Sequence, residues 1–336
     1  MGQGDQGRRD QRGLRNSEAA ALALLALCVP ARAQEWPTRP VTMVIPFAAG
    51  GPTDLLGRVM AANLSQRLGQ QIVVENVGGA GGMTGANRVA KAAADGYQFM
   101  LGGSGAVIYN QFLYKKPLFN VTTELAPVAM IAEQPLVLVT RKDFPADDLA
   151  AFIAHAKRNQ ATMSYGSAGA GSTSHLACVL LNLAMGTTIT HVPYRGGAPA
   201  TQDLQGGRID FMCDFVSTAL PQIEGHTVKA IATLAGVRAA VLPDLPTAQE
   251  QGLAGFDASS WLGFLLPKGT PAPIVAKLHD ATAAAMDSSA VRERLQGLGV
   301  SVVGPERRSS EYLAQHIAGE LAKWAAPIRA SGASAD

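Results

Sequence analysis

Short apolar runs alternate with glycine-containing turns and helical stripes along most of this sequence. An apolar, β-branched run at 41–47 ends in a glycine turn, and residues 55–68 then place apolar side chains at helical spacing. Strand-like runs follow at 71–75 and 97–101, and between them a glycine-rich turn opens a helix that runs to Lys91. This order of strand, turn, helix and strand predicts βαβ units, in which helices cover a mostly parallel sheet.

The same order of elements begins again after Pro135. Strand-like runs lie at 136–140, 162–165, 189–192, 208–214 and 228–234, with helices at 147–158, at 199–204 and after a Gly/Ser loop at 166–174. An apolar strand at 261–266 then precedes three helices, at 271–286, 290–298 and 309–328. Two such units followed by helices predict an α/β fold with two lobes and a cleft between them.

The first 33 residues have the composition of a targeting segment. Four arginines between Arg8 and Arg15 precede an apolar run at 19–29, and Ala31-Arg32-Ala33 places small residues around a cleavage position. This order predicts a secretory signal peptide, cleaved near Ala33, and a periplasmic mature protein. The apolar run is far shorter than the ~20 residues that a membrane-spanning helix needs. The alternative is a disordered tail followed by a buried helix.

The charge balance changes when this leader is set aside. The 336 residues include 28 Lys and Arg against 26 Asp and Glu, and residues 1–33 hold five of the former and three of the latter. The remaining chain therefore has 23 of each, which excludes the basic surface typical of nucleic-acid-binding proteins. Six scattered histidines and three cysteines without a CxxC pair predict neither a metal site nor a cofactor. Beyond the leader, Cys178 and Cys213 either form a disulfide or remain as buried thiols.

Three strand-to-helix turns are rich in glycine and small hydroxyl residues. They lie at 50–53, 169–174 and 196–199. Ligands of open α/β sheets bind where such turns follow the strands, and the free N–H groups of a helix N-terminus attract anions. Together the three turns predict an anion-binding site.

The sequence motifs of common enzymes are absent. No GxxxxGK[ST] or GxSxG motif occurs, and the glycine pattern at 169–174 departs from the dinucleotide fingerprint. Ser172 and His175 lie three residues apart at a predicted helix start. One interpretation is that Ser172 is a catalytic nucleophile and His175 its general base. An N-cap serine beside a histidine is the reading that we prefer.

Several motifs together resemble the Bug family, the extracytoplasmic solute receptors of tripartite tricarboxylate transporters. The resemblance extends from Trp36 to about Ile328. Its motifs are PFAAGGPTD at 46–54, ADGY at 94–97, SAGAGSTSHL at 167–176, HVPYRGGAPA at 191–200 and LPDLPT at 242–247. The sequence departs from the family at Val77-Gly78, where an Arg-Pro pair is usual.

The resemblance implies a two-lobed class II periplasmic-binding-protein fold. We expect residues 34–133 and 235–336 to form the first lobe and 134–234 the second. The expected function is that of a non-enzymatic receptor, which captures a small organic carboxylate by hinge closure. It would deliver this ligand to a permease of one large and one small membrane subunit. The alternatives are an adaptor that presents its ligand to a sensor kinase and, more remotely, a secreted hydrolase that uses Ser172 and His175.

The expected ligand-binding residues belong to the glycine turns and the strand ends beside them. They are Phe47, Ala48, Gly50, Gly51, Thr53, Asp54, Ser104, Ser167, Gly169, Gly171, Ser172, Thr173, His175, Tyr194, Arg195, Gly196, Asp214 and Trp261.

Overall fold

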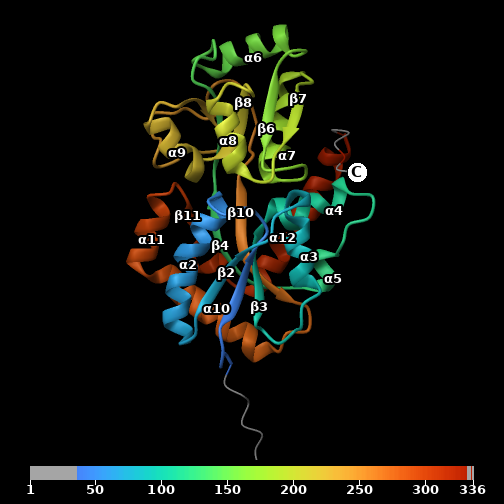
Figure 1. Cartoon of the computed structure of the whole chain (residues 1–336), viewed down its shortest axis with the longest axis vertical. Coiled ribbons are helices and arrows are strands. Elements are labelled where there is room, and N and C mark those ends of the chain that lie inside the picture. The colour runs from blue at the N-terminus through green and yellow to red at the C-terminus, as the bar shows by residue number, and fades with distance from the viewer. Residues whose placement is uncertain (1–35, 331–333, 335–336) are drawn as a thin grey trace, which may run out of the picture. The chain divides into compact units, whose positions relative to one another are not determined.

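Two β-sheets organise the chain after Arg39, in a computed structural model that describes residues 36–330 and residue 334. The first sheet has the strand order β11-β4-β10-β3-β1-β2. Its strands are β1 (Val41–Ile45), β2 (Ile72–Asn76), β3 (Gln98–Gly103), β4 (Leu125–Gln134), β10 (Ser260–Pro267) and β11 (Ser301–Val302). Strand β1 is parallel to β2 and β3, whereas β10 runs antiparallel to both β3 and β4. Strand β11 is also antiparallel to β4, so the sheet is parallel on one side and antiparallel on the other (Figure 1).

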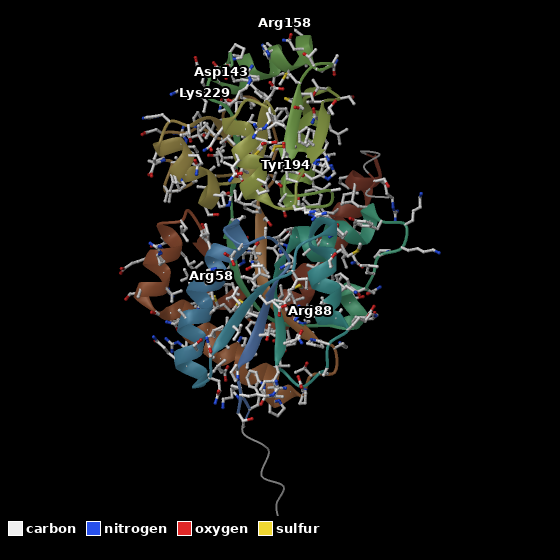
Figure 2. All side chains as sticks on the ribbon, viewed as in Figure 1. Arg58, Arg88, Asp143, Arg158, Tyr194 and Lys229 are labelled. Carbon is white, nitrogen blue, oxygen red and sulfur yellow. A yellow bond between two sulfur atoms is a disulfide. The ribbon has the colours of Figure 1, made fainter. Side chains whose placement is uncertain are left out.

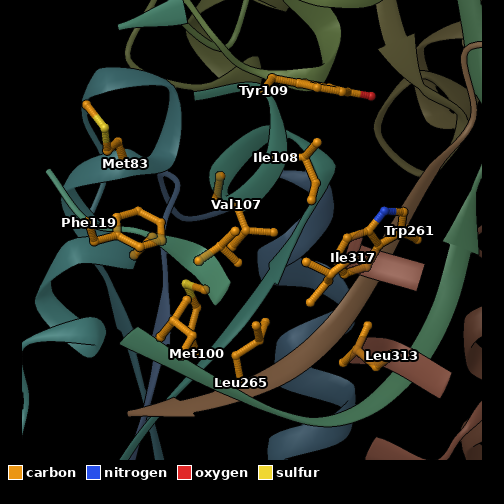
Figure 3. Close-up of a cluster of buried hydrophobic side chains, with 14 of the residues drawn as sticks. Met83, Met100, Val107, Ile108, Tyr109, Phe119, Trp261, Leu265, Leu313 and Ile317 are labelled. Carbon is orange, nitrogen blue, oxygen red and sulfur yellow. The ribbon is translucent and has the colours of Figure 1, made fainter. Parts of the chain in front are cut away.

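Helices from both ends of the chain pack against this sheet and define the first lobe. They are α2 (Pro52–Leu68), α3 (Met83–Ala90), α4 (Asn110–Leu113), α5 (Val121–Glu124), α10 (Ala272–Asp287), α11 (Ser289–Gln296) and α12 (Ser310–Ala330), with the short helical segments η1 (Ala80–Gly82), η2 (Ser104–Tyr109) and η3 (Pro305–Arg307). The core under α12 includes Met100, Val107 and Ile317 (Figure 3). Tyr109 meets Trp324 edge to face at 4.9 Å between ring centroids, which fixes α12 on η2.

The second lobe is built on a sheet with the strand order β7-β6-β8-β5-β9. Its elements are β5 (Leu136–Arg141), α6 (Leu149–Asn159), β6 (Ser164–Ser167), α7 (Thr173–Met185), β7 (Thr190–Pro193), α8 (Gly197–Gln205), β8 (Phe211–Phe215), α9 (Val216–Glu224) and β9 (Val228–Thr233). Strand β6 is parallel to β7 and β8, and β5 is antiparallel to β8 and β9. Both sheets therefore direct several strand ends toward loops that lead into helices.

The chain passes from the first sheet to the second within two residues, between β4 and β5. The return differs from the sequence expectation, which assigned residues 235–336 to the first lobe. Ala248, Phe256 and Ala258 belong to the core of the second sheet, and the Ala258 N–H donates to the Leu234 carbonyl. The stretch from 235 to about 259 thus packs with the second lobe, and β10 then re-enters the first sheet. The other predicted boundary, at 133/134, stays a prediction.

Most predicted elements occur within a few residues of their expected positions, but β4, α9 and the short α4, α5 and β11 were not predicted. Strand β4 contains Pro127 and two polar residues at its end, so its sequence shows neither alternation nor a purely apolar run. Helix α9 carries Pro221 inside it, which removes one backbone donor and ordinarily argues against a helix. In both cases tertiary packing outweighs local sequence preference.

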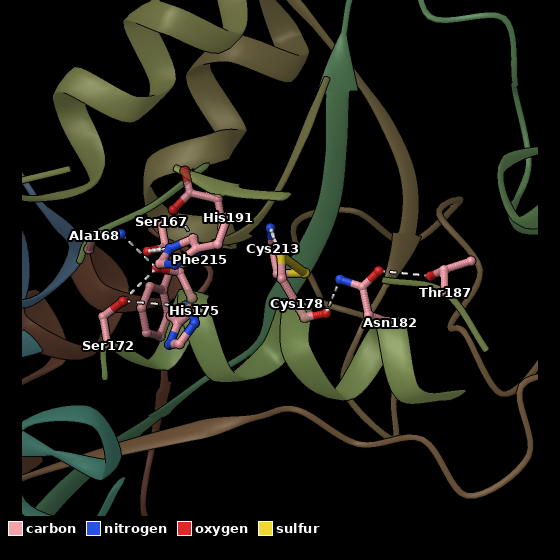
Figure 4. The surroundings of a disulfide bond; sticks show 12 residues. Ser167, Ala168, Ser172, His175, Cys178, Asn182, Thr187, His191, Cys213 and Phe215 are labelled. Carbon is pink, nitrogen blue, oxygen red and sulfur yellow. Dashed lines mark hydrogen bonds between the residues drawn. A yellow bond between two sulfur atoms is a disulfide. The ribbon is translucent and has the colours of Figure 1, made fainter. Parts of the chain in front are cut away.

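A disulfide joins Cys178 on α7 to Cys213 on β8, with their Cα atoms 5.6 Å apart (Figure 4). The sequence had left these two cysteines either paired or free. Both residues are fully buried in the core of the second lobe. The bond fixes α7 against the strand that ends beside its N-terminal loop.

Candidate functional site

A cavity lies between the two lobes, and the loops after five strands line it. The first lobe contributes Phe47, Ala48, Gly51, Pro52, Thr53, Gly103, Gly105 and Ala106, together with Ser260 and Leu262 of β10. The second lobe contributes Ala168, Ser172, Thr173, Ser174, Gly197, Asp214 and Phe215. The space amounts to about 530 Å³, including the part that opens to solvent.

Three helices begin at this cavity. Gly51, Ser172 and Gly196 are the N-caps of α2, α7 and α8, and each of these helices contributes lining residues from its first turn. The first N–H groups of a helix have no intrahelical acceptor, and the helix dipole places a partial positive charge there. The cavity therefore offers anion-binding groups from both lobes without a basic side chain.

The turn before α2 is held by a buried carboxylate. Asp54 is 2% exposed and accepts hydrogen bonds from Gly50 N, Arg58 Nε and Asn76 Nδ2 at 2.9, 2.8 and 3.0 Å. Burial alone would raise the pKa of Asp54, but these hydrogen bonds hold it below its usual value. Asp54 and Gly50 do not line the cavity, and their role in the structure is to fix the turn that does.

The loop before α7 is held by its own hydroxyl groups. Ser172 Oγ accepts from His175 N at 3.3 Å, which is N-cap geometry, and lies 3.1 Å from Ser174 Oγ. Ser174 Oγ accepts in turn from Ala168 N at 3.0 Å. Ser167 Oγ bonds both Gly169 N and His191 Nε2, at 3.1 and 2.7 Å. These bonds leave the loop rigid, with Ser172, Thr173 and Ser174 facing the cavity.

Two stacked histidines support this loop from behind. The rings of His175 and His191 are 4.1 Å apart, and Tyr165 stacks on His191 at 4.9 Å. His175 Nδ1 accepts a hydrogen bond from Gly171 N at 3.2 Å (the surroundings are drawn in Figure 4). Burial lowers the pKa of His175 to about 3 and that of His191 to about 4, so both rings are neutral near pH 7. Gly171 and His175 therefore shape the site without contributing charge.

Among the described residues that line the cavity, Asp214 is the one that carries a charge. It ends β8, is 4% exposed, and accepts a hydrogen bond from Phe215 N through Oδ1 at 2.8 Å. Burial raises the pKa of Asp214 to about 6, and hydrogen bonds from Thr218 and Phe215 oppose that rise only in part. Other charged side chains, such as Arg58, Arg88 and Arg158, lie on the outer surfaces of the lobes (Figure 2).

Tyr194, Arg195 and Gly169 border a second hollow, on the other side of Ala48 and Ala168. The Tyr194 hydroxyl donates to Asp203 at 2.7 Å, and Figure 2 places Tyr194 where the second lobe approaches the first. Arg195 is exposed and does not line the main cavity. These three residues line the second hollow and not the main cavity, and their expected contact with a ligand stays a prediction.

Two of the contacts between the lobes depend on glycines. A Cβ atom on Gly81 of the first lobe would lie 2.2 Å from the carbonyl oxygen of Ala170 in the second. A Cβ atom on Gly196 of the second lobe would lie 2.8 Å from the Cβ of Ala48 in the first. Real Cβ atoms do not approach so closely, so only glycine allows these two contacts. We call this pair of contacts the glycine seam.

Two further expected residues, Trp261 and Ser104, do not line the cavity. Trp261 is buried in the core of the first lobe, beside Ile317 and with its ring 5.1 Å from that of His316 (Figure 3). Ser104 is fully buried and accepts from Ser260 Oγ at 3.4 Å. Side chains of a strand alternate between its faces, so Ser260 and Leu262 line the cavity because Trp261 faces the core.

The lining residues that sequence reasoning missed are neighbours of those it selected. They are Pro52, Gly103, Gly105, Ala106, Ala168, Ser174, Gly197, Phe215, Ser260 and Leu262. Most belong to the predicted turns and lack a distinctive side chain. For Ser260 and Leu262 the period of two along β10 was the available signal.

Within residues 36–330 and 334, no group of three or more His, Cys, Asp or Glu side chains is arranged to hold a metal ion. No helix in the part of the chain that the structure describes is both long and apolar enough to cross a bilayer.

Comparison with known proteins identifies the family. The model of the tripartite tricarboxylate transporter family receptor matches residues 56–333. A protein of Agrobacterium vitis, from the TAR-I ttuE–ttuC′ intergenic region, is 41% identical over 94% of this chain and 92% of its own. Among solved structures, the periplasmic binding protein BugD has a TM-score of 0.86 at 37% identity and covers 89% of this chain and 99% of its own. MatC from Rhodopseudomonas palustris, with bound malate, has a TM-score of 0.84 at 41% identity over 87% of this chain and 100% of its own.

These likenesses confirm the two-lobed fold of class II periplasmic binding proteins and the role of a solute receptor. The chain therefore belongs to the receptor family of tripartite tricarboxylate transporters, the Bug family of extracytoplasmic solute receptors.

Proposed function

We propose that this receptor captures a small organic carboxylate between its lobes and delivers it to a membrane permease of one large and one small subunit. The observation that carries the proposal is the convergence of the N-termini of α2, α7 and α8 on one cavity. Backbone N–H groups at helix starts bind carboxylates without a basic side chain. The bound malate of the related MatC supports the same ligand class.

Capture depends on contacts from both lobes. The turn at Thr53 and the loop at Thr173 lie on opposite lobes and line the same cavity. A ligand that bonds both therefore has a higher affinity for the closed arrangement, and it shifts the lobes toward closure by that difference in affinity. The hinge is formed by the chain crossings at Gln134 to Leu136 and before Ser260.

We also propose that the protein acts in the periplasm and catalyses no reaction. The leader at 1–33 lies outside the described residues, and the N-terminal sequence of the exported protein tests cleavage near Ala33. Ser172 Oγ caps α7, and His175 Nδ1 accepts from Gly171 N, so neither group is placed to activate the other. An ester substrate that the protein turns over, with loss of turnover on Ser172→Ala, would overturn the non-enzymatic assignment.

Titration calorimetry of the exported protein tests ligand capture, with a panel of mono-, di- and tricarboxylates as ligands. We expect at least one acid to bind in a one-to-one ratio and to raise the melting temperature. Failure of every organic acid to bind would contradict the proposal. Delivery is tested separately by uptake of the radiolabelled ligand, which should be lost when either the receptor or the large permease subunit is deleted.

A further inference from the structure

The cavity of this anion receptor contains an acidic side chain and no basic one. Of the described residues that line it, Asp214 is charged, and none is Arg, Lys or His. Asp214 is 4% exposed. A second negative charge at close range would be repelled strongly in such a weakly polar place. A carboxylate alone is therefore a poor complement to this end of the cavity.

The surroundings of Asp214 do not neutralise its charge. Its pKa is influenced by burial and by hydrogen bonds from Thr218 and Phe215, and no charged neighbour contributes. Because burial raises that pKa only to about 6, the group is ionised at neutral pH and accepts hydrogen bonds without donating any. The bonds from Phe215 N, at 2.8 Å, and from Thr218 leave part of the accepting capacity of Asp214 available.

The neighbouring hydroxyl groups are already engaged with the protein. Ser172 and Ser174 bond each other and backbone N–H groups, and Ser260 donates to Ser104. A purely structural role for Asp214, acceptance of the Phe215 N–H, would be served equally by a neutral asparagine. Asp214 already accepts from Phe215 N and from Thr218, and a carboxylate can accept more bonds than these, so a donor on the ligand is a further partner that it can take.

We propose that Asp214 selects, among small carboxylic acids, those that carry a hydroxyl or ammonium donor next to a carboxylate. The carboxylate would face the helix N-termini, and the donor would bond the Asp214 carboxylate. This inference rests on the proposed function, because it assumes a carboxylic acid in the cavity. A hydroxyl and an ammonium group share the required donor and differ in charge, so matched ligands distinguish them.

The test compares succinate, L-malate and L-aspartate, which share a four-carbon diacid skeleton and carry hydrogen, hydroxyl or ammonium at C2. Calorimetry at pH 7.5 should show that the better of malate and aspartate binds at least tenfold more tightly than succinate. The same comparison is made with three-, five- and six-carbon skeletons. Preference for aspartate over malate would assign the donor as ammonium, and the reverse as hydroxyl.

In the variant Asp214→Asn, the affinities for the substituted and the unsubstituted acid should differ by no more than about twofold. The unsubstituted acid should bind at least as tightly as it does to the wild type. Retained binding of the unsubstituted acid shows that the variant is folded. Asp280→Asn, at an exposed carboxylate, is the matched control and should keep the preference. The inference is overturned if unsubstituted acids bind as tightly as substituted ones at every chain length that binds, or if Asp214→Asn keeps the preference. If no acid of either kind binds, the proposed function itself fails.

Discussion

Replacing Asp214 by asparagine should stabilise the ligand-free protein at alkaline pH. The substitution keeps the shape and the acceptor for Phe215 N and removes a buried charge. The pKa of Asp214 rises from 3.8 to about 6 on folding, which corresponds to about 3 kcal/mol at 1.36 kcal/mol per pH unit. For a protein of this size, a gain of about 3 kcal/mol raises the melting temperature by about 5 °C.

The pH dependence gives this prediction its direction. Because the folded pKa of Asp214 lies above the unfolded one, the native state binds more protons between pH 4 and 6. The contribution of Asp214 to stability is therefore complete below about pH 4 and is lost as the pH rises through about 6. The gain from Asp214→Asn should accordingly be about 3 kcal/mol at pH 8 and near zero at pH 4.

Urea unfolding of the ligand-free protein at pH 4, 6 and 8, followed by circular dichroism, measures this difference. Asp280→Asn is the control, because the Asp280 side chain is 79% exposed, and its change should stay within about 0.5 kcal/mol. An equal effect of Asp214→Asn at pH 4 and pH 8, or a loss of stability at pH 8, would refute the reasoning.

Three further predictions concern the disulfide, the seam and the buried imidazoles. Replacing Cys178 and Cys213 by serine should lower the free energy of unfolding by about 4 kcal/mol, as expected for a cross-link that spans 35 residues, and urea titration measures this. Gly81→Ala should weaken ligand binding by tenfold or more in calorimetry, because its Cβ would lie 2.2 Å from a backbone oxygen of the other lobe. The His175 ring should not titrate between pH 5 and 8 in NMR spectra. The free energy of unfolding should fall as the pH drops below 6.5, because His175 is then protonated in the unfolded chain but stays neutral in the folded one.

Each of these has a control and a result that would count against it. For the seam the control is Gly186→Ala, because Gly186 has a positive φ of 68° similar to the 59° of Gly81 but nothing near its Cβ position. Equal losses of affinity in both variants would mean that backbone strain, and not contact between lobes, is responsible. If the double variant Cys178→Ser, Cys213→Ser were as stable as the wild type, packing alone would hold α7 in place. A His175 NMR signal that shifts near pH 6.5 would show that the ring is hydrated.

The order of elements followed from the sequence because glycine turns and apolar runs mark strand ends locally. The cavity was predicted in outline for the same reason, since Phe47, Thr53, Ser172, Thr173 and Asp214 lie at such ends and line it. These residues were found without knowledge of which strands pair.

The remaining site residues depend on tertiary information. Trp261 was selected for its aromatic ring, but its register in β10 turns it into the core and turns Ser260 and Leu262 outward. The stretch from 235 to 259 has no regular element that would assign it to a lobe, and its packing beside Phe152 became visible only in three dimensions. Arg195 carries the charge that sequence reasoning associates with an anion, yet backbone groups line the cavity in its place.

The glycine seam has a consequence for divergence and engineering of this scaffold. The lobes touch at Gly81 and Gly196 through backbone and a single methyl group, so no side chain at these contacts encodes a ligand. Cavity positions such as Asp214, Phe215 and Leu262 do not belong to the seam, so substitutions there can alter the chemistry of the cavity alone. Substitutions at these cavity positions leave both contacts of the seam in place, so the ligand preference of a sensor built on this scaffold can be changed without altering the seam.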